Sequence, residues 1–199
     1  MVKFERQSNL FNNYHINRSA LNDLKDVYIN EKTIKDWQEK IINFQSEVFQ
    51  NNNHNLSQYS LFDSHSEEII ETFNPLELTP LPLSFWKWPK APHEGPAVYF
   101  VIDKTIHTQE NIILYIGETF SASKRWKGDH DCKTYLSNYS EKLQKANLKS
   151  NLNIRFWLDV PHETKARRKL EQKLIKTWLP PFNKETRSFW STPFTSQIN

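Results

Sequence analysis

The pattern of apolar residues changes near residue 97, and this change constrains the fold more than any other feature. Two apolar runs of strand length, separated by polar residues that favour a hairpin, cover Ala97–Ile102 and Ile112–Ile116. From Leu152 to Asp159 apolar and polar side chains alternate, as they do in a strand with one buried face. These patterns predict a small sheet of three strands.

Helical patterns lie between and after these strands. We expect short helices over residues 121–128 and 139–148, and a longer helix over 162–178 that Pro180 and Pro181 terminate. The resulting order, β-β-α-α-β-α, predicts an α+β fold over residues 95–185, in which helices flank a small three-stranded sheet.

The first 90 residues are expected to form a mainly helical or irregular N-terminal arm. Over residues 33–49 apolar side chains recur every three or four positions, which indicates an amphipathic helix. This helix either packs on the rest of the protein or mediates contact with a partner, for example in a homodimer. We also expect an Asn-rich linker over 51–56, an extended proline-rich stretch over 75–96 and a C-terminal tail over 186–199.

Charge and glycine are distributed unevenly. Residues 1–90 carry 9 Lys/Arg and 12 Asp/Glu, a net charge of −3, whereas residues 91–199 carry 17 and 11, a net charge of +6. A basic half suits a polyanionic partner. Average usage gives roughly 14 glycines for this length, but the chain has three, Gly95, Gly117 and Gly128. We expect these to mark positions where a side chain would obstruct the backbone or its neighbours.

Composition excludes several classes of protein. No apolar run approaches the roughly 18–20 residues of a membrane span, and residues 1–15 lack the apolar core of a signal peptide. Cys132 is the only cysteine, which excludes an intramolecular disulfide and a cysteine-built zinc site. We therefore expect a cytoplasmic protein that contacts no membrane.

Glu171 occupies an unusual position in the last predicted helix. On a helical wheel it falls within an apolar arc, between Trp178 and Ile175. The other members of this arc are Ala166, Leu170 and Leu174. Burial of a carboxylate is costly unless it is paired or bound to a cation. The position is compatible with an ion pair to an arginine, with a metal ligand or with an exposed rim. The opposite face either is solvated or contacts phosphates, and it carries Lys165, Lys169, Lys173 and Lys176.

Two tripeptides in the predicted strands, Ala97-Val98-Tyr99 and Tyr115-Ile116-Gly117, resemble the paired elements of the GIY-YIG nuclease superfamily. The arginine of that family lies ten residues after the second tyrosine, and Arg125 has this spacing. Its metal-binding glutamate lies on a later helix, as Glu171 does. An asparagine after a proline-containing turn matches Asn183. The resemblance covers about residues 95–185.

The resemblance implies a metal-dependent DNA endonuclease. Glu171 would hold Mg²⁺ or Mn²⁺, and Arg125 would face the scissile phosphate. Tyr99 or Tyr115 would accept a proton from the attacking water, with the adjacent cation and arginine favouring the phenolate. The remaining expected residues are Asn183 in the catalytic set, Gly117, which would let the DNA backbone approach, and Lys124, Lys169 and Lys173 as contacts for DNA.

Three positions depart from the family's pattern. Ala97 replaces the first glycine, which strand geometry tolerates. The family commonly has His or Tyr four residues after the arginine, where this chain has Asp129. The adjacent His130 would fill that catalytic role, with Tyr135 or Tyr139 as weaker substitutes. Glu118 stands where some relatives have lysine, and it would either support the metal or disfavour DNA.

A second resemblance lies in the N-terminal half. The segment Gln58–Phe62 resembles the pentapeptide that binds the bacterial sliding clamp, and Gln7–Phe11 is a looser copy. Recruitment to replicating or repaired DNA would suit a structure-selective enzyme of repair or recombination, while restriction-like cleavage stays open. The alternatives are a catalytically inactive DNA-binding or clamp-associated protein with the GIY-YIG fold, and an interaction module built on the Trp- and Phe-rich surface.

Overall fold

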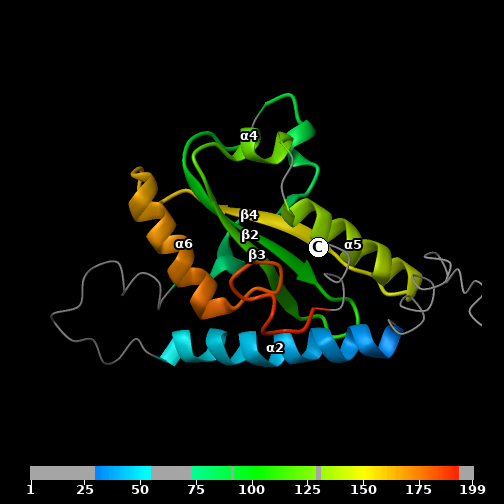
Figure 1. The fold of residues 1–199 in the computed structure, drawn as a ribbon. Helices are drawn as coiled ribbons and strands as arrows, with labels where there is room; N and C mark the ends of the chain where they lie inside the picture. Colours follow the sequence, from blue (N-terminus) through cyan, green and yellow to red (C-terminus); the bar gives the residue numbers. More distant parts are fainter. Residues whose placement is uncertain (1–29, 55–72, 91, 129–130, 193–199) are drawn as a thin grey trace, which may run out of the picture.

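The sheet in the computed structural model has four antiparallel strands, one more than the sequence predicts (Figure 1). The structure describes residues 30–54, 73–90, 92–128 and 131–192. The strands lie in the order β1-β4-β2-β3, and they are β1 (Leu81–Pro82), β2 (Ala97–Lys104), β3 (Asn111–Thr119) and β4 (Leu152–Trp157).

The α+β class is confirmed, but the expected number of strands is wrong. The proline-rich stretch before Ala97 contributes β1, which pairs with β4 at the edge of the sheet. An edge strand can contain Pro82 because only one of its sides takes part in the hydrogen-bond ladder. The rest of that stretch is extended only in part, since it also forms the short 3-10 helices η2 (Pro75–Glu77) and η3 (Phe85–Lys87).

An irregularity in the hairpin decides which way β3 presents its side chains. β2 and β3 pair on either side of a register shift, and Leu114 lies between the partners of Val101 and Ile102 without a partner of its own. This β-bulge places Leu114 and Tyr115, although adjacent in sequence, against the same cluster of buried residues. Regular alternation would send them to opposite faces, so the bulge determines where Tyr115 lies.

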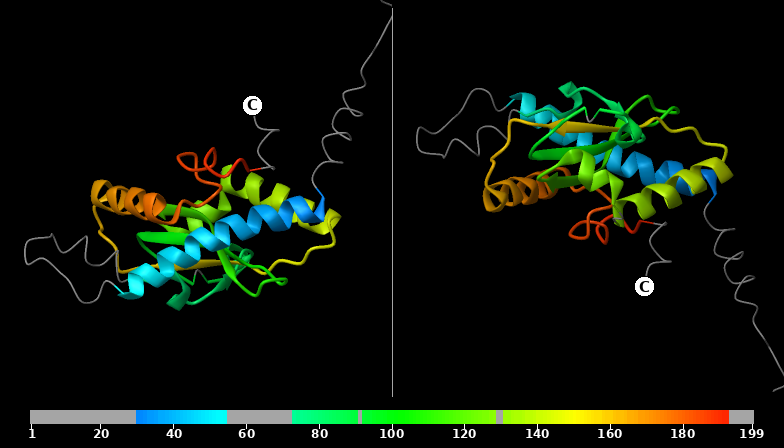
Figure 2. Two further views of the ribbon diagram at one scale, coloured as in Figure 1. Left: turned by 90° about the horizontal axis from the view of Figure 1, so that it is seen from below. Right: turned by 90° about the horizontal axis from the view of Figure 1, so that it is seen from above.

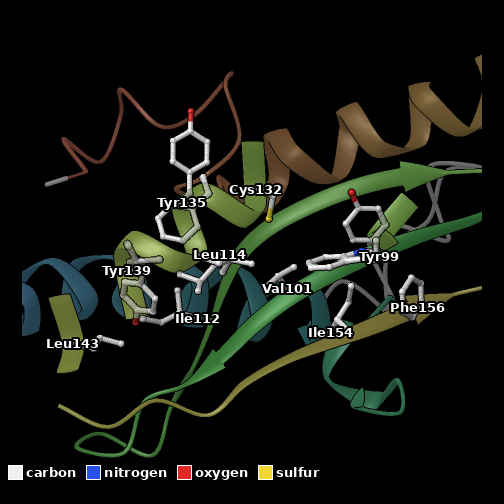
Figure 3. Close-up of a cluster of buried hydrophobic side chains, with 14 of the residues drawn as sticks. Tyr99, Val101, Ile112, Leu114, Cys132, Tyr135, Tyr139, Leu143, Ile154 and Phe156 are labelled. Atoms are coloured by element: carbon white, nitrogen blue, oxygen red, sulfur yellow. The ribbon is translucent and has the colours of Figure 1, made fainter. Parts of the chain in front are cut away.

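Helices cover both faces of the sheet. α4 (Ala122–Lys127) and α5 (Asp131–Lys145) pack on one face, and Figure 3 shows α5 side chains against those of the strands. α6 (Thr164–Trp178) packs on the other face. The expected start of α5 at residue 139 is wrong. The helix begins at Asp131 because Cys132 and Tyr135 also belong to its buried side.

The N-terminal helix α2 (Glu31–His54) crosses the lower side of the molecule in Figure 1, and Figure 2 shows its length from below. It packs on the rest of the protein, as the first of the two interpretations predicts. The ring of Trp37 stacks on Phe182 at a centroid distance of 6.3 Å, and the centroid of Phe49 lies 4.2 Å from that of Trp178. The expected linker is wrong over residues 51–54, because the helix continues through them.

Gln45 attaches α2 to the outer side of β3. This side chain is fully buried, and its Oε1 accepts the N–H of Ile113 at 2.8 Å. Its Nε2 donates to the carbonyl oxygens of Ile113 and Trp178, each at 3.0 Å. One amide therefore joins α2, the edge strand β3 and the end of α6.

The chain after α6 folds back onto the domain. Thr186 and Thr192, expected in a tail, are buried, and the indole N–H of Trp190 donates to the carbonyl oxygen of Leu179. Some of the expected features lie outside the described residues. These are residues 55–56 of the linker, residues 193–199 of the tail, Asp129, His130 and both clamp-like pentapeptides. Within the described ranges, no helix combines the length and the apolar character needed to cross a membrane.

Candidate active site

Three of the expected catalytic residues come together from separate elements. Two neighbouring cavities, of about 420 Å³ and about 330 Å³, share Tyr115 of β3, Arg125 of α4 and Glu171 of α6 as lining residues. These residues span 57 positions of the sequence (115 to 171). The fold therefore assembles a polar site where the end of the hairpin meets both helices.

The two tyrosines occupy different positions in this site. Tyr99 is fully buried and lies at the end of the apolar cluster opposite Leu143 in Figure 3. Its ring stacks on that of Tyr115 at a centroid distance of 6.0 Å and meets Trp126 edge-on at 5.9 Å. Tyr115 is only partly buried and lines both cavities, whereas Tyr99 lines one of them. Tyr115 is thus the more accessible of the two.

Hydrogen bonds connect these phenols to Arg125. The guanidinium bonds to both Tyr99 and Tyr115, although Arg125 itself is exposed to solvent. Burial nevertheless raises the pKa of Tyr99 well above its usual value and that of Tyr115 to about 12, and it outweighs the opposing effect of Arg125. Arg125 favours the phenolate forms, as expected, but without a cation its effect does not offset that of burial.

Gly117 creates the space in which the two rings lie. A Cβ atom there would stand 2.5 Å from Cζ and Oη of Tyr99 and 2.9 Å from Cε1 of Tyr115. These distances are far below van der Waals contact. We expected Gly117 to let a DNA backbone approach, but the groups that lie close to it here are the two tyrosine rings. Gly117 therefore permits the arrangement of these two side chains.

Glu171 faces the cavities from α6 with one oxygen held. Its Oε1 accepts the backbone N–H of Glu118 at 3.0 Å. Burial, followed by the negative charges of Glu118 and Glu185, raises the pKa of Glu171 to about 7, although the hydrogen bond from Glu118 opposes this. A carboxylate in such an environment is stabilised by any cation that reaches it.

Glu118 is paired with two arginines of α6. Its Oε2 accepts from Nε of Arg167 at 2.8 Å, and its Oε1 from Nε of Arg168 at 3.3 Å. Arg167 is 1% exposed and also donates to the carbonyl oxygens of Pro161 and His162. The sequence is compatible with an ion pair between Glu171 and an arginine, but the residue that forms such a pair is Glu118. The charge of Glu118 is therefore largely balanced before any ligand arrives.

Asn183 lines the larger cavity but uses its amide on the backbone of β3. Oδ1 accepts the N–H of Ile116 at 3.0 Å, and Nδ2 donates to the carbonyl oxygen of Ile116 at 2.8 Å. The side chain is almost completely buried. Its geometry is that of a residue that positions the strand carrying Tyr115, since both ends of the amide are already bonded.

The remaining expected residues lie elsewhere. Lys124, Lys169 and Lys173 line neither cavity, and Lys124 and Lys169 are exposed. Of the two substitutes for the family's His or Tyr, Tyr135 lines the larger cavity and accepts from Nη1 of Arg187 at 2.6 Å. Tyr139 is buried away from the site and donates to Asp103 at 2.7 Å.

Sequence reasoning missed several residues that line the cavities. Arg168 and Phe120 border the smaller one, and the larger one includes Asp131, Gln172, Lys184 and Glu185. Arg168 lies one turn before Glu171 on α6, so a helical wheel could have shown that the two side chains are neighbours. The places of Asp131, Lys184 and Glu185 depend on how the turn after α6 meets the start of α5, which no local pattern specifies.

Comparisons with known proteins add no further constraint. No protein-family model, curated protein or solved structure matches this chain. Functional inference therefore rests on the geometry of the site and on the sequence elements that occupy it.

Proposed function

We propose that the protein is a metal-dependent DNA endonuclease of the GIY-YIG kind. The observation that carries the proposal is the convergence of Tyr115, Arg125 and Glu171 on shared cavities. The sequence indicates these residues through their order, their spacing and the elements on which they lie, and Arg125 and Glu171 follow Tyr115 by 10 and 56 positions. In the structure they line the same two cavities, which supports the resemblance that selected them. A tyrosine, an arginine and a metal-binding carboxylate can together orient a water and neutralise charge on the phosphate, as phosphodiester hydrolysis requires.

The residues present fit a single divalent cation. Among the described residues no group of three or more His, Cys, Asp or Glu side chains gathers at one point. This does not conflict with Mg²⁺, which often keeps several waters and binds through one or two carboxylates and substrate phosphates. Oε1 of Glu171 is engaged by the N–H of Glu118, and the described residues give Oε2 no hydrogen bond. Glu171 would hold the cation through this second oxygen.

Each side chain has a distinct part in the proposed hydrolysis. Arg125 is exposed, so its guanidinium can contact the scissile phosphate while the phenols hold the opposite side of the fork. Burial raises the pKa of Tyr115 to about 12 without a cation, so its hydroxyl would orient the attacking water. It would accept the proton of that water only when a bound cation and Arg125 together favour the phenolate. Tyr99 positions Tyr115 and Arg125 from the buried side. The chemistry that a bound cation supplies is Lewis-acid stabilisation of the charge on the phosphate.

The balanced charge of Glu118 supports a site for an anion. Without Arg167 and Arg168, Glu118 and Glu171 would place two negative charges at the cavity that the phosphate must enter. Because the two arginines pair with Glu118, Arg125 can act on the phosphate with little opposition from that carboxylate. The departure from the family pattern at Glu118 is thus compatible with DNA binding.

Cleavage assays test the proposal. The purified protein and its Glu171→Gln, Arg125→Ala and Tyr115→Phe variants would be incubated with Mg²⁺ or Mn²⁺ and plasmid, linear, flapped and branched DNA. We expect metal-dependent cleavage that falls about 10²–10³-fold in the Arg125 and Glu171 variants. Glu163→Gln, which changes an exposed carboxylate at the start of α6, should cleave as the wild type does.

Binding measurements separate the enzyme from its inactive alternative. Titration of Mn²⁺, followed by its electron paramagnetic resonance signal, should show a site that Glu171→Gln weakens and Glu163→Gln does not. If the wild type binds DNA but cleaves none of these substrates with either cation, the protein is a non-catalytic DNA-binding protein.

Recruitment by a sliding clamp is a separate proposal. It concerns Gln58–Phe62, and it predicts that Leu61→Ala with Phe62→Ala abolishes binding to a bacterial clamp. Absence of any clamp binding by the wild type would refute it.

A further inference from the structure

One aromatic side chain at the rim of the proposed active site is exposed to an unusual degree. Phe120 is 69% exposed, the highest fraction of any large hydrophobic residue in the described ranges. It lines the smaller cavity together with Tyr115, Arg125 and Glu171. Other exposed large hydrophobic residues in the described part of the chain, Trp88, Ile106, Leu158 and Phe189, line neither cavity.

The turn that carries Phe120 is anchored on both sides. Before it, Thr119 is almost fully buried, pairs with Ala97 and accepts the N–H of Ser121 at 3.0 Å through its Oγ1. After it, α4 begins at Ala122, which is fully buried, and Trp126 fixes the helix in the core. The phenyl ring is therefore held out into solvent by a fixed backbone at the mouth of the site.

The groups around Phe120 suit a nucleic acid strand. Arg125 and Arg168 line the same cavity, and the Arg168 side chain is 68% exposed, with a single 3.3 Å contact to Glu118. Two accessible guanidinium groups beside a flat apolar ring provide contacts for phosphates and for the face of a base. An apolar side chain of a peptide could pack on the ring, but it would gain nothing from the two adjacent guanidinium groups.

We propose that Phe120 stacks on an unpaired base next to the scissile phosphate, so that the enzyme prefers DNA with a single-stranded segment at the cleavage site. This inference rests on the proposed function. Inside an uninterrupted duplex the faces of the bases are covered by their neighbours, and a ring reaches them only by separating two stacked base pairs, which costs a few kcal/mol. At a flap, gap or branch point at least one base is free to stack. Phe120 is then a residue that determines substrate class.

Binding of cleavage-deficient protein tests the proposal without relying on activity. In the Glu171→Gln background, a DNA with a single-stranded flap and an uninterrupted duplex of equal length would be titrated with protein in Ca²⁺-containing buffer. Loss of one base–aromatic stack corresponds to an affinity about 5- to 150-fold weaker. We expect Phe120→Ala to lose this much for the flapped DNA and almost nothing for the duplex, and Phe120→Trp to retain flap binding.

Phe189→Ala is the matched control. Phe189 is 64% exposed, close to the value for Phe120, but it packs against Phe44 and Trp190 away from the cavities. This variant should bind both DNAs unchanged. A 2-aminopurine base at the flap junction provides a direct readout, because stacking on Phe120 should change its fluorescence and Phe120→Ala should abolish that change.

The outcomes distinguish this inference from the proposed function. If the wild type cleaves DNA but Phe120→Ala binds flapped DNA and duplex as tightly as its parent does, the inference is wrong and the nuclease stands. If Phe120-dependent binding of the flap is observed but the wild type cleaves nothing, the nuclease proposal fails and base stacking survives. Equal losses in Phe120→Ala and Phe189→Ala would also overturn the inference.

Discussion

Replacement of Asn183 distinguishes a residue that positions β3 from one that acts on substrate. Its two hydrogen bonds to Ile116, at 3.0 and 2.8 Å, involve a buried backbone N–H and a buried backbone carbonyl. In Asn183→Ala both groups lose their partner. Each buried polar group left unpaired costs roughly 1–3 kcal/mol, so we expect the free energy of unfolding to fall by about 2–6 kcal/mol.

Urea denaturation measures this change, and Asn43→Ala is a suitable control. Asn43 is exposed on α2, so its replacement should alter stability by less than about 0.5 kcal/mol. Asn183→Asp adds a second test, because a carboxylate oxygen would replace the N–H donor opposite the carbonyl of Ile116. We expect it to be at least as destabilising as alanine at neutral pH and to recover in part when acid protonates the carboxylate.

Cleavage by the folded fraction of Asn183→Ala completes the test. A positioning role predicts that activity per folded molecule falls much less than in Arg125→Ala, and that stability falls strongly. The reasoning is refuted if Asn183→Ala is as stable as the wild type but cleaves as poorly as Arg125→Ala. That result would place Asn183 in contact with the substrate.

Three further perturbations follow from the same contacts. Gln45→Ala should destabilise the protein by roughly 3–5 kcal/mol in urea denaturation, because three buried hydrogen bonds are lost. Gln50 is an exposed glutamine of the same helix, so Gln50→Ala should have little effect on stability. Equal losses of stability in the two variants would contradict the role of Gln45. Gly117→Ala should cost about 1–3 kcal/mol in a thermal melt, since its Cβ would lie 2.5 Å from the ring of Tyr99; an unchanged melting temperature would refute this. The pKa of Glu171 is raised from 4.5 to about 7, so without divalent cations the unfolded state binds fewer protons than the folded state between these values. Stability of the wild type should fall as pH rises from about 4.5 to about 7, and Glu171→Gln should lack this fall; identical pH profiles would show that another group is responsible.

The elements with strong local patterns could be predicted from the sequence. The runs that form β2 and β3 consist of apolar residues because both faces of the sheet are covered. The periodicity of α6 and of α2 is equally clear, because each helix packs one side against the sheet. For the same reason Glu171 could be located within the buried arc of α6 before its surroundings were known.

Features that depend on contacts between distant segments could not be predicted. The bulge at Leu114 leaves no mark in a run where every residue is apolar. β1 has two residues and contains a proline, so it resembles a turn. A polar run such as Asn51–Asn53 predicts a linker, but the helix continues through it.

The candidate site likewise combines features that the sequence predicts with features that depend on contacts between distant segments. The sequence indicates Tyr115, Arg125 and Glu171, but no local pattern shows that Glu118 is paired with Arg167 and Arg168. These ion pairs join β3 to α6 across about 50 positions of sequence. The lysine stripe of α6 suggests contacts for DNA, yet the basic residue of α6 that lines a cavity is Arg168.

The amides on β3 also affect how copies of this protein can associate. β3 is the outermost strand of the sheet, and a strand in that position ordinarily offers free N–H and carbonyl groups to a strand from another molecule. Here Gln45 occupies those of Ile113, Asn183 those of Ile116, and Glu171 the N–H of Glu118. The other edge, β1, is two residues long and ends in proline. Within the part of the chain that the structure describes, neither edge of the sheet can readily be extended by another strand, so association of copies through their sheets is disfavoured.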